Sequence, residues 1–432
     1  MASVKEIPVP HKPLAHILPE HSRVNESGHL EIGGCDVIDV AREFGTPAFI
    51  FSEEDIRARI REYIDTFSGQ TDAFEVLFAS KSLNCKAIYQ LVKEEGLSID
   101  VASGGELFMA LQAGIEPERI YFHGNNKGEA ELRMAIDAGV GHLILDSFDE
   151  IVLLDSLLKR PQKVLIRVTP GVKPETHQAT QTGQADSKFG FGLHSGQARE
   201  AINAVRCSQN LSLNGLHAHV GSQILNLEIF LQEIDALATI ADSSIPLLNI
   251  GGGLGIAYAQ GEIPPTIEEY ITAVVERVQL RFDPVPRILV EPGRSLVGNA
   301  GITAYRIGTI KDLPGIRKYV AVDGGMSDNL RPMLYRAKYE VLIANKFNAE
   351  PDTRATIVGK HCETGDNLVE EAMLASPEIG DILVTPATGA YGHSMANNYN
   401  GSPRPPVIFC KDGDARVVVR RETFEDLVIR DC

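Results

Sequence analysis

The stretch Pro246-Leu247-Leu248-Asn249-Ile250-Gly251-Gly252-Gly253-Leu254-Gly255 is a short apolar run that ends directly on a glycine cluster. The chain repeats this arrangement, because eight apolar runs each end on a polar or glycine-rich cluster. They are Glu75–Ala79, Leu97–Val101, Arg119–His123, His142–Asp146, Lys163–Val168, Asn214–His219, Pro246–Ile250 and Arg287–Glu291. Strands that are separated by helical stretches predict a (β/α)8 barrel. The residues just past the strand ends then face one common mouth, where such barrels carry their chemistry.

Apolar residues at helical spacing indicate the helices of this barrel and of the segment before it. The predicted helices are Val37–Phe44, Glu54–Ser68, Ala87–Glu95, Gly105–Ala113, Lys127–Ala138 and Thr266–Leu280. Gly96, Gly114 and Gly139 come just after three of these helices, as C-terminal caps usually do.

The same pattern divides the chain into an arm over residues 1–45 with a hairpin near Asn25–Gly28, a barrel over 46–294 and a second domain over 295–432. Short β runs separated by turn residues predict that the second domain is a mostly antiparallel β structure of the sandwich or barrel type. These runs are Tyr319–Asp323, Tyr339–Ala344, Ala355–Gly359, Asp381–Thr385, Pro406–Cys410 and Ala415–Val419. The long gap between Val168 and Asn214 contains the polar stretch His177–Ser187, which suggests a loop over the mouth.

Composition restricts the class of protein. At 432 residues the chain is long enough for two domains, and 41 basic against 58 acidic residues give a net charge of −17. This charge argues against nucleic acid or an anionic membrane as the main partner. Six cysteines lack metal-type and disulfide-type spacing, and the N-terminus lacks a signal or transit pattern. With no apolar run of about 18 residues, these features predict a cytoplasmic protein without a membrane span.

Two of the strand ends carry groups that suit a phosphorylated aldehyde cofactor. Lys81, in Phe78-Ala79-Ser80-Lys81, follows the first strand, and a lysine in a barrel mouth can form a Schiff base with an aldehyde or a carbonyl. A surface lysine on a loop is the alternative. Gly251-Gly252-Gly253 follows the seventh strand, where barrels commonly bind phosphate through backbone N–H groups. A tight turn explains the glycines equally well.

Two further strand ends carry a carboxylate and a histidine pair. Glu291-Pro292-Gly293-Arg294 ends the eighth strand, and its glutamate can bond a protonated pyridine nitrogen or form a structural ion pair with Arg294. His217 and His219 lie two apart on one strand and face the same side. That spacing would suit two ligands of a zinc ion. It would equally let one imidazole lie against an aromatic cofactor while the other packs against the protein. No third or fourth ligand follows nearby, which disfavours a metal. Ser222 follows closely and can donate to a phosphate.

The second domain adds further polar candidates. Cys362-Glu363 stands in a glycine-containing loop, and its thiol is either a proton donor or an ordinary loop cysteine. Tyr391 lies in a flexible turn, as a ligand contact or a packed side chain. Arg331 and Tyr335 can bind a carboxylate or form a plain turn. Together with the strand ends of the barrel, these groups are the ones that a site for pyridoxal phosphate and an amino acid with extra carboxylates would need.

On these residues the chain resembles the fold-type III pyridoxal phosphate decarboxylases, and within them the diaminopimelate decarboxylase branch, from about residue 28 onward. The motifs that carry the resemblance are Phe78–Lys81, His123–Lys127, Ser187–Gly190, His217–Gln223, Gly251–Gly255, Glu291–Arg294, Arg331–Tyr335, His361–Asp366 and Ala390-Tyr391. Gly124–Lys127, His219–Gln223 and Cys362-Glu363 together favour this branch over the ornithine and arginine branches. The chain departs from the family at Ser82-Leu83, where Ala-Asn is common, and at Thr364, where Ser is usual.

The resemblance implies an activity and a set of residue roles. The enzyme would decarboxylate meso-2,6-diaminopimelate to L-lysine and CO2, the last step of lysine biosynthesis, and the N-terminal arm would join the β domain. Lys81 would hold pyridoxal 5′-phosphate as a Schiff base, Glu291 would bond the pyridine nitrogen and His219 would stack on the ring. Further cofactor contacts would come from Ser222, Gly252, Gly253, Pro292, Gly293, Arg294 and Tyr391. The substrate would be held by Arg294, Arg331, Tyr335, Glu363 and Tyr391.

The family also implies a homodimer, in which Cys362 is the catalytic proton donor and reaches the other subunit's site together with Glu363, and no metal is expected. A related decarboxylase of another acidic amino acid, free or carrier-bound, would use the same groups. A non-catalytic pyridoxal phosphate carrier is typically a single barrel, whereas this chain keeps a β domain. Racemisation would need a second base opposite Lys81, and the mouth offers Cys362 rather than a tyrosine.

Overall fold

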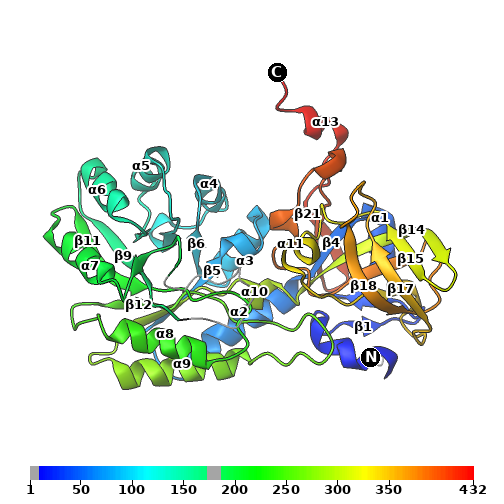
Figure 1. Ribbon diagram of the computed structural model, residues 1–432, viewed down its shortest axis with the longest axis horizontal. Helices are drawn as coiled ribbons and strands as arrows, with labels where there is room; N and C mark the ends of the chain where they lie inside the picture. Colours follow the sequence, from blue (N-terminus) through cyan, green and yellow to red (C-terminus); the bar gives the residue numbers. More distant parts are fainter. Residues whose placement is uncertain (1–8, 173–185) are drawn as a thin grey trace. The chain divides into compact units, whose positions relative to one another are not determined.

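The computed structural model of the protein describes residues 9–172 and 186–432, which belong to two compact units (Figure 1). Arg59–Gly255 and Pro264–Ser295 form the barrel unit. Met1–Ala58, Ile256–Ile263 and Leu296–Cys432 form the β unit. The loop predicted over His177–Ser187 falls, up to residue 185, outside the described residues. None of the helices in the described part of the chain is long and apolar enough to cross a membrane.

The barrel unit contains eight parallel strands that close on themselves. They are β5 (Phe74–Ala79), β6 (Ser98–Val101), β7 (Ile120–Phe122), β8 (His142–Leu145), β9 (Gln162–Thr169), β11 (Leu211–His217), β12 (Leu247–Asn249) and β13 (Arg287–Val290). Each strand pairs with the next, and β13 pairs with β5, so no edge remains free. The predicted (β/α)8 barrel is therefore confirmed, with every strand at its predicted place. A short extra strand, β10 (Phe191–Gly192), pairs with β9.

One helix precedes the first barrel strand and seven follow barrel strands, and several of them contact the next helix along the chain (Figure 1). They are α2 (Glu53–Ser68), α3 (Lys86–Glu94), α4 (Gly104–Gln112), α5 (Glu129–Ala138), α6 (Phe148–Leu157), α7 (Gln197–Cys207), α8 (Glu228–Ala238) and α9 (Ile267–Arg281). Of these, α2 begins in the β unit and continues into the barrel unit. The hydroxyls of Ser103, Ser147 and Thr266 accept hydrogen bonds from the backbone N–H three residues on, at the starts of α4, α6 and α9. These caps satisfy helix N–H groups that have no partner within the helix, and so fix where the three helices begin.

The interior of the barrel is filled by apolar side chains. Six strands each contribute one buried residue to a single cluster, formed by Leu77, Tyr121, Ile144, Leu165, Leu247 and Leu289. A barrel of eight strands is just wide enough for such side chains to fill it, so it contains a packed core and no channel. Polar groups therefore collect at the ends of the strands, where the site lies.

The β unit is built around a sheet of nine strands. They are β4 (Ala48–Ser52), β14 (Gly301–Leu313), β15 (Arg317–Val322), β16 (Leu342–Ile343), β17 (Thr353–Val358), β18 (Asn367–Leu374), β19 (Ile382–Thr385), β20 (Val407–Lys411) and β21 (Asp414–Val419). Six of their eight pairings are antiparallel, and β15–β17 and β4–β20 are parallel. The prediction of a mostly antiparallel β domain is thus confirmed.

The N-terminal part of the chain belongs to this β unit. The predicted hairpin is present as β1 (Arg23–Val24) and β2 (Leu30–Ile32), which is followed by β3 (Cys35–Asp36) and α1 (Val37–Phe44). Apolar residues of this arm pack against β4, β14 and β20 in one buried cluster. The strand β4 itself pairs with β14 and β20. The expectation that the arm contributes to the β domain is confirmed.

Candidate active site

Lys81 occupies a tight turn that directly follows β5. Its side chain is exposed, whereas Ser80 and Ser82 on either side are fully buried. The Ser82 hydroxyl donates to the carbonyl of Ala79 at 2.8 Å, which closes the turn. The buried serines anchor the turn, so the lysine amine is presented at the end of the first strand.

A buried carboxylate, that of Glu291, lies at the end of β13. Nε2 of His123 is 2.8 Å from its Oε1, and Nε2 of His217 is 3.4 Å from its Oε2. The amide of Asn249 donates to Oε1 at 2.7 Å. Burial opposes the charge, but the two histidines outweigh it and hold the pKa of Glu291 well below its usual range. Burial lowers the pKa of His217 to about 4 and also lowers that of His123. The cluster therefore favours the carboxylate form of Glu291.

The glycine turn after β12 packs against its neighbours so closely that side chains are excluded. A Cβ atom at Gly252 would lie 2.2 Å from the carbonyl oxygen of Glu291, and one at Gly253 would lie 2.4 Å from that of Gly221. Gly253 also has a φ of 121°, which L side chains rarely adopt. The N–H of Gly252 donates to Nδ1 of His219 at 3.3 Å. The turn thus places its backbone, and the imidazole of His219, beside the end of β13.

The segment after β13 adds a serine–arginine pair. Nη2 of Arg294 donates to the hydroxyl of Ser222 at 2.8 Å, and Arg294 begins the short helix α10 (Arg294–Val297). A Cβ atom at Gly293 would lie 2.9 Å from side-chain atoms of Ala79 and Ser82, so this glycine lets the segment approach the lysine turn. A hydroxyl, a guanidinium and a glycine-rich backbone are the donors that phosphate-binding sites use.

These residues of the barrel unit fit pyridoxal 5′-phosphate. Lys81 is an amine for the aldehyde, and the ionised Glu291 is an acceptor for a protonated pyridine nitrogen. His219 supplies a flat ring, and Ser222 with Arg294 and the glycine turn supplies donors for a phosphate. Glu291 is the strongest support for this fit. Its neighbours keep its side chain ionised, whereas a buried carboxyl group without such neighbours would be neutral.

Three side chains that lie near Glu291 in the structure were not among the site residues predicted from the sequence. His123 and Asn249 contact the carboxylate, and Asp100 at the end of β6 has a pKa that burial and Glu291 raise well above its usual range. His123 ends a predicted strand, so its position at the mouth was a usable signal. The sequence also offered no third metal ligand, but ligand atoms of His123, His217 and Glu291 lie within 4.8 Å of one another.

One motif of the barrel has a structural explanation. The Lys127 ammonium is buried, 2.7 Å from a carboxylate oxygen of Glu150. It also donates to the carbonyls of Gly124 at 2.7 Å and Ile144 at 2.8 Å. The lysine therefore fastens the loop after β7 to the end of β8.

The remaining predicted site residues lie in the β unit. Arg331, in α11 (Arg331–Tyr335), is buried, and its guanidinium lies 4.4 Å from the ring centre of Tyr258 and hydrogen-bonds the hydroxyl of Tyr339. Burial opposes its charge, but these tyrosines outweigh it and raise the pKa of Arg331. Tyr391 is half-buried and has a φ of 66°, a backbone strain of the kind that clusters at functional sites.

Cys362 and Glu363 are exposed at the tip of a loop with a buried base. Asp366 accepts hydrogen bonds from the N–H groups of His361 at 2.9 Å and Met326 at 2.7 Å, which ties the base together. At the tip, the N–H of Cys362 donates to the side chain of Asn400 at 3.0 Å. The loop thus holds a thiol and a carboxylate in place while leaving both accessible.

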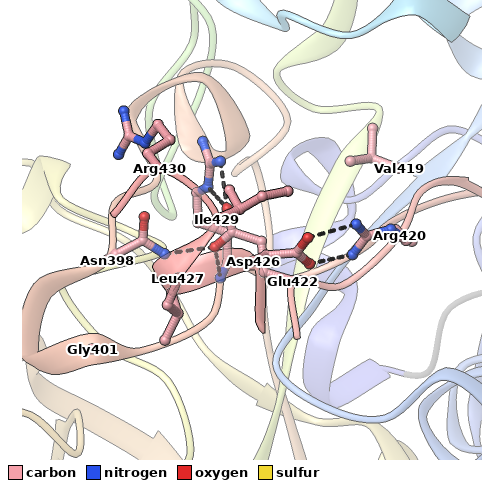
Figure 2. A pocket seen from close by; sticks show the side chains of 10 residues that line it. Asn398, Gly401, Val419, Arg420, Glu422, Asp426, Leu427, Ile429 and Arg430 are labelled. Carbon is pink, nitrogen blue, oxygen red and sulfur yellow. Dashed lines mark hydrogen bonds and ion pairs between the residues drawn. The ribbon is translucent and has the colours of Figure 1, made fainter. Parts of the chain in front are cut away.

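A separate pocket of about 770 Å³ lies near the C-terminus of the β unit (Figure 2). Two of its three arginines are already paired, Arg404 with Glu422 and Arg420 with Asp426. None of the predicted site residues lines it, and it offers no group for covalent chemistry. It therefore does not compete with the barrel mouth as an active site.

Comparison with known proteins identifies the class to which this fold and site belong. Residues 53–298 match the model of the pyridoxal-dependent decarboxylase family, pyridoxal binding domain. The match spans more than half of the chain, and the chain belongs to this family. It is accordingly a decarboxylase that uses pyridoxal phosphate.

Individual relatives show which members of this family the chain is similar to. The diaminopimelate decarboxylase of Bacillus subtilis is 46% identical over 422 residues, which cover 94% of this chain and 96% of the relative. That of Halalkalibacterium halodurans is 45% identical over 421 residues, covering 94% and 96%. Among solved structures, the diaminopimelate decarboxylase of M. jannaschii in co-complex with L-lysine is 32% identical, with a TM-score of 0.89 and coverage of 96% and 98%.

Proposed function

We propose that this enzyme decarboxylates meso-2,6-diaminopimelate to L-lysine and CO2, as the last step of lysine biosynthesis. The observation that carries the proposal is the 46% identity to a diaminopimelate decarboxylase over nearly the full length of both chains. The structure of the M. jannaschii relative is a complex with L-lysine, which would be the product of this reaction.

The barrel unit supplies the residues for the cofactor. Pyridoxal phosphate, when bound, accepts into its ring the electron pair left by the departing CO2. Lys81 provides the amine that anchors the aldehyde, and Glu291 accepts a hydrogen bond from the ring nitrogen. His219 packs against the ring. Ser222 and Arg294 bind the phosphate, together with the backbone of Gly252, Gly253, Pro292 and Gly293.

The β unit supplies the residues for the substrate and the proton. Sγ of Cys362 gives the proton that replaces the lost carboxylate, and its exposure on the loop makes it accessible. Diaminopimelate carries a second amino group and a second carboxylate at its distal end. Glu363 binds the distal ammonium, and Arg294 and Arg331 bind the distal carboxylate with Tyr335 and Tyr391 beside them. Tyr391 also contacts the cofactor.

Turnover of defined substrates tests the proposed reaction. Purified enzyme supplied with pyridoxal phosphate is expected to release CO2 and L-lysine in equal amounts from meso-diaminopimelate, and less from the L,L isomer. The Lys81→Ala variant is the matched control for reaction by free cofactor. Cofactor-loaded enzyme that releases no lysine from the meso isomer would contradict this function and point to another acidic amino acid as the substrate.

The active enzyme is proposed to be a homodimer in which Cys362 and Glu363 serve the partner's site. Exposure of both side chains on a loop with a fixed base supports this arrangement. Mixed dimers test it. When Lys81→Ala and Cys362→Ala chains are combined at random, half of the dimers are mixed, and each mixed dimer has one intact site only if Cys362 acts across the interface. Recovery of about a quarter of wild-type activity is expected. No recovery in verified mixed dimers would place Cys362 in its own subunit's site.

We infer a cytoplasmic location and no nucleic acid or membrane partner. The net charge of −17 disfavours polyanions, and all six cysteines are free thiols, as a reducing compartment requires. Fractionation of cells that express the full-length chain tests this, because recovery with membranes or in an oxidising compartment would contradict it.

A further inference from the structure

Two histidines from different strands converge on the carboxylate of Glu291. His123 follows β7 and His217 ends β11, and their Nε2 atoms face opposite oxygens of the carboxylate, at 2.8 Å and 3.4 Å. Their rings also contact each other edge to face, with centroids 4.8 Å apart. Because β7, β11 and β13 are not all neighbours in the sheet, this cluster exists only through closure of the barrel.

The environment of Glu291 makes these contacts necessary for an ionised carboxylate. Its side chain is 5% exposed, and burial without partners would favour the neutral acid. A neutral carboxyl group presents a proton where a pyridinium N–H needs an acceptor. Instead, the two imidazoles lie within ion-pair distance of the carboxylate, and the amide of Asn249 donates a hydrogen bond to it.

We propose that His123 and His217 are positioning residues, which hold the carboxylate of Glu291 ionised and oriented toward the ring nitrogen of pyridoxal phosphate. The inference rests on the proposed role of Glu291 and adds a function for two residues that bind neither cofactor nor substrate themselves. Nε2 of each imidazole lies next to a different carboxylate oxygen, so the two oxygens have different fixed neighbours. The remaining acceptor capacity of the carboxylate is then available to the ring nitrogen.

Other charged groups surround this cluster from different elements. Arg167 of β9 and Lys81 add positive charge, which disfavours protonation of the histidines, while Asp100 of β6 and Glu233 of α8 lie on the acidic side. Burial raises the pKa of both Asp100 and Glu233 well above the usual range. Glu291 is therefore the carboxylate of this group that has a histidine beside each of its oxygens.

A comparison of two cofactors isolates the contact that the histidines support. Apoenzyme is titrated with pyridoxal 5′-phosphate and with 1-deazapyridoxal 5′-phosphate, which has carbon in place of the ring nitrogen, and both dissociation constants are measured. In His123→Phe, the constant for pyridoxal phosphate is expected to rise about tenfold to a hundredfold, because a hydrogen bond to a charged group is lost. The constant for the deaza analogue is expected to change less than about threefold, since it has no ring nitrogen to bond.

Two further variants separate positioning from folding. His123→Gln keeps an N–H donor of similar reach and is expected to recover most of the affinity for pyridoxal phosphate. His142→Phe is the matched control, because His142 is also a buried barrel histidine but contacts Tyr121 and Asn214 rather than Glu291. If His123→Phe fails to fold, His217→Gln and His217→Phe replace the pair, and circular dichroism verifies the fold of each variant.

Equal weakening of both cofactors by His123→Phe would overturn the proposal, because it would show a general structural effect. Divalent metal retained by dialysed apoenzyme at one ion per chain would also overturn it, since the cluster would then be a metal site. These outcomes are distinct from failure of the proposed reaction. The binding comparison uses no substrate, so it holds whether or not the enzyme acts on diaminopimelate.

Discussion

The barrel unit and the β unit present their candidate site residues in opposite ways. In the barrel, Glu291, His217 and Asp100 are buried and their pKa values are shifted by one another and by burial. In the β unit, Cys362 and Glu363 are exposed at the tip of a loop. The barrel therefore contains a preorganised electrostatic cluster within one chain, at the place where we propose that the cofactor binds. The β unit contributes accessible reactive groups, which is what delivery to another site would require.

The largest effect is expected at Lys81. Lys81→Ala removes the amine that we propose anchors the cofactor, and turnover should fall by roughly a thousandfold or more. The visible absorbance of the cofactor attached to the protein should be lost as well. Steady-state kinetics and an absorbance titration measure both. Lys86→Ala, at an exposed lysine of α3, is the control. Persistence of the attached-cofactor absorbance in Lys81→Ala would place the anchor elsewhere.

Cys362→Ala is expected to impair turnover without impairing cofactor binding. Loss of a proton donor should lower kcat by about a hundredfold to ten-thousandfold, while cofactor affinity stays unchanged because Cys362 is not among the residues proposed to hold the cofactor. Parallel measurement of turnover and of the cofactor dissociation constant tests this, with the exposed Cys207 replaced by alanine as the control. If both quantities fell together, Cys362 would be supporting the cofactor site rather than supplying a proton.

Strand ends in the barrel were predictable from sequence because each parallel strand is a compact apolar run that stops at a polar or glycine cluster. The β unit was harder. The long strand β14 was not predicted, since it begins with five buried residues and continues with mostly exposed ones, and β18 was hidden by exposed Glu370 and Glu371. The helix α8 was missed as well, since buried Glu233 interrupts its apolar face.

The site residues likewise divide into those that the sequence predicted and those that it could not predict. Lys81, Glu291 and the glycine turn follow strands, so the rule that barrel mouths gather strand ends predicted their place. The partnership of His123 with Glu291 was not predictable, because it joins β7 to β13 through closure of the barrel. For Arg331, the sequence indicated a carboxylate ligand, but of the two tyrosines beside its guanidinium, Tyr258 comes from a distant segment.

Arg331→Lys tests whether the β unit binds the substrate through Arg331. Lysine keeps the charge but cannot stack flat on Tyr258 while bonding Tyr339, so its ammonium would be poorly positioned. KM for the substrate is expected to rise roughly tenfold, with a smaller change in kcat and none in cofactor affinity. Arg336→Lys, at the exposed arginine after α11, is the control. A loss confined to kcat would indicate that Arg331 acts on the chemical step instead of binding substrate.

Acid stability distinguishes the barrel from the β unit in the absence of any ligand. His123, His142, His217 and His219 all lie in the barrel, and burial lowers the pKa of each. For His142 the pKa falls to about 4, with Lys163 and Arg287 adding to the effect of burial. The unfolded chain binds a proton at this residue near pH 6.5, so its contribution to stability is complete above that pH. The contribution is lost as the pH falls toward the folded pKa.

His142→Phe tests this because His142 lies away from Glu291 and can be replaced without touching the cofactor residues. Between pH 7.5 and pH 5, the wild-type free energy of unfolding should fall, and roughly 2 kcal/mol of that fall should be absent in the variant. Urea unfolding at the two pH values measures the difference, with the exposed His194 of the barrel replaced by glutamine as the control. If His142→Phe kept the full pH dependence, the acid sensitivity would come from the Glu291 cluster, where burial of histidine serves the cofactor site.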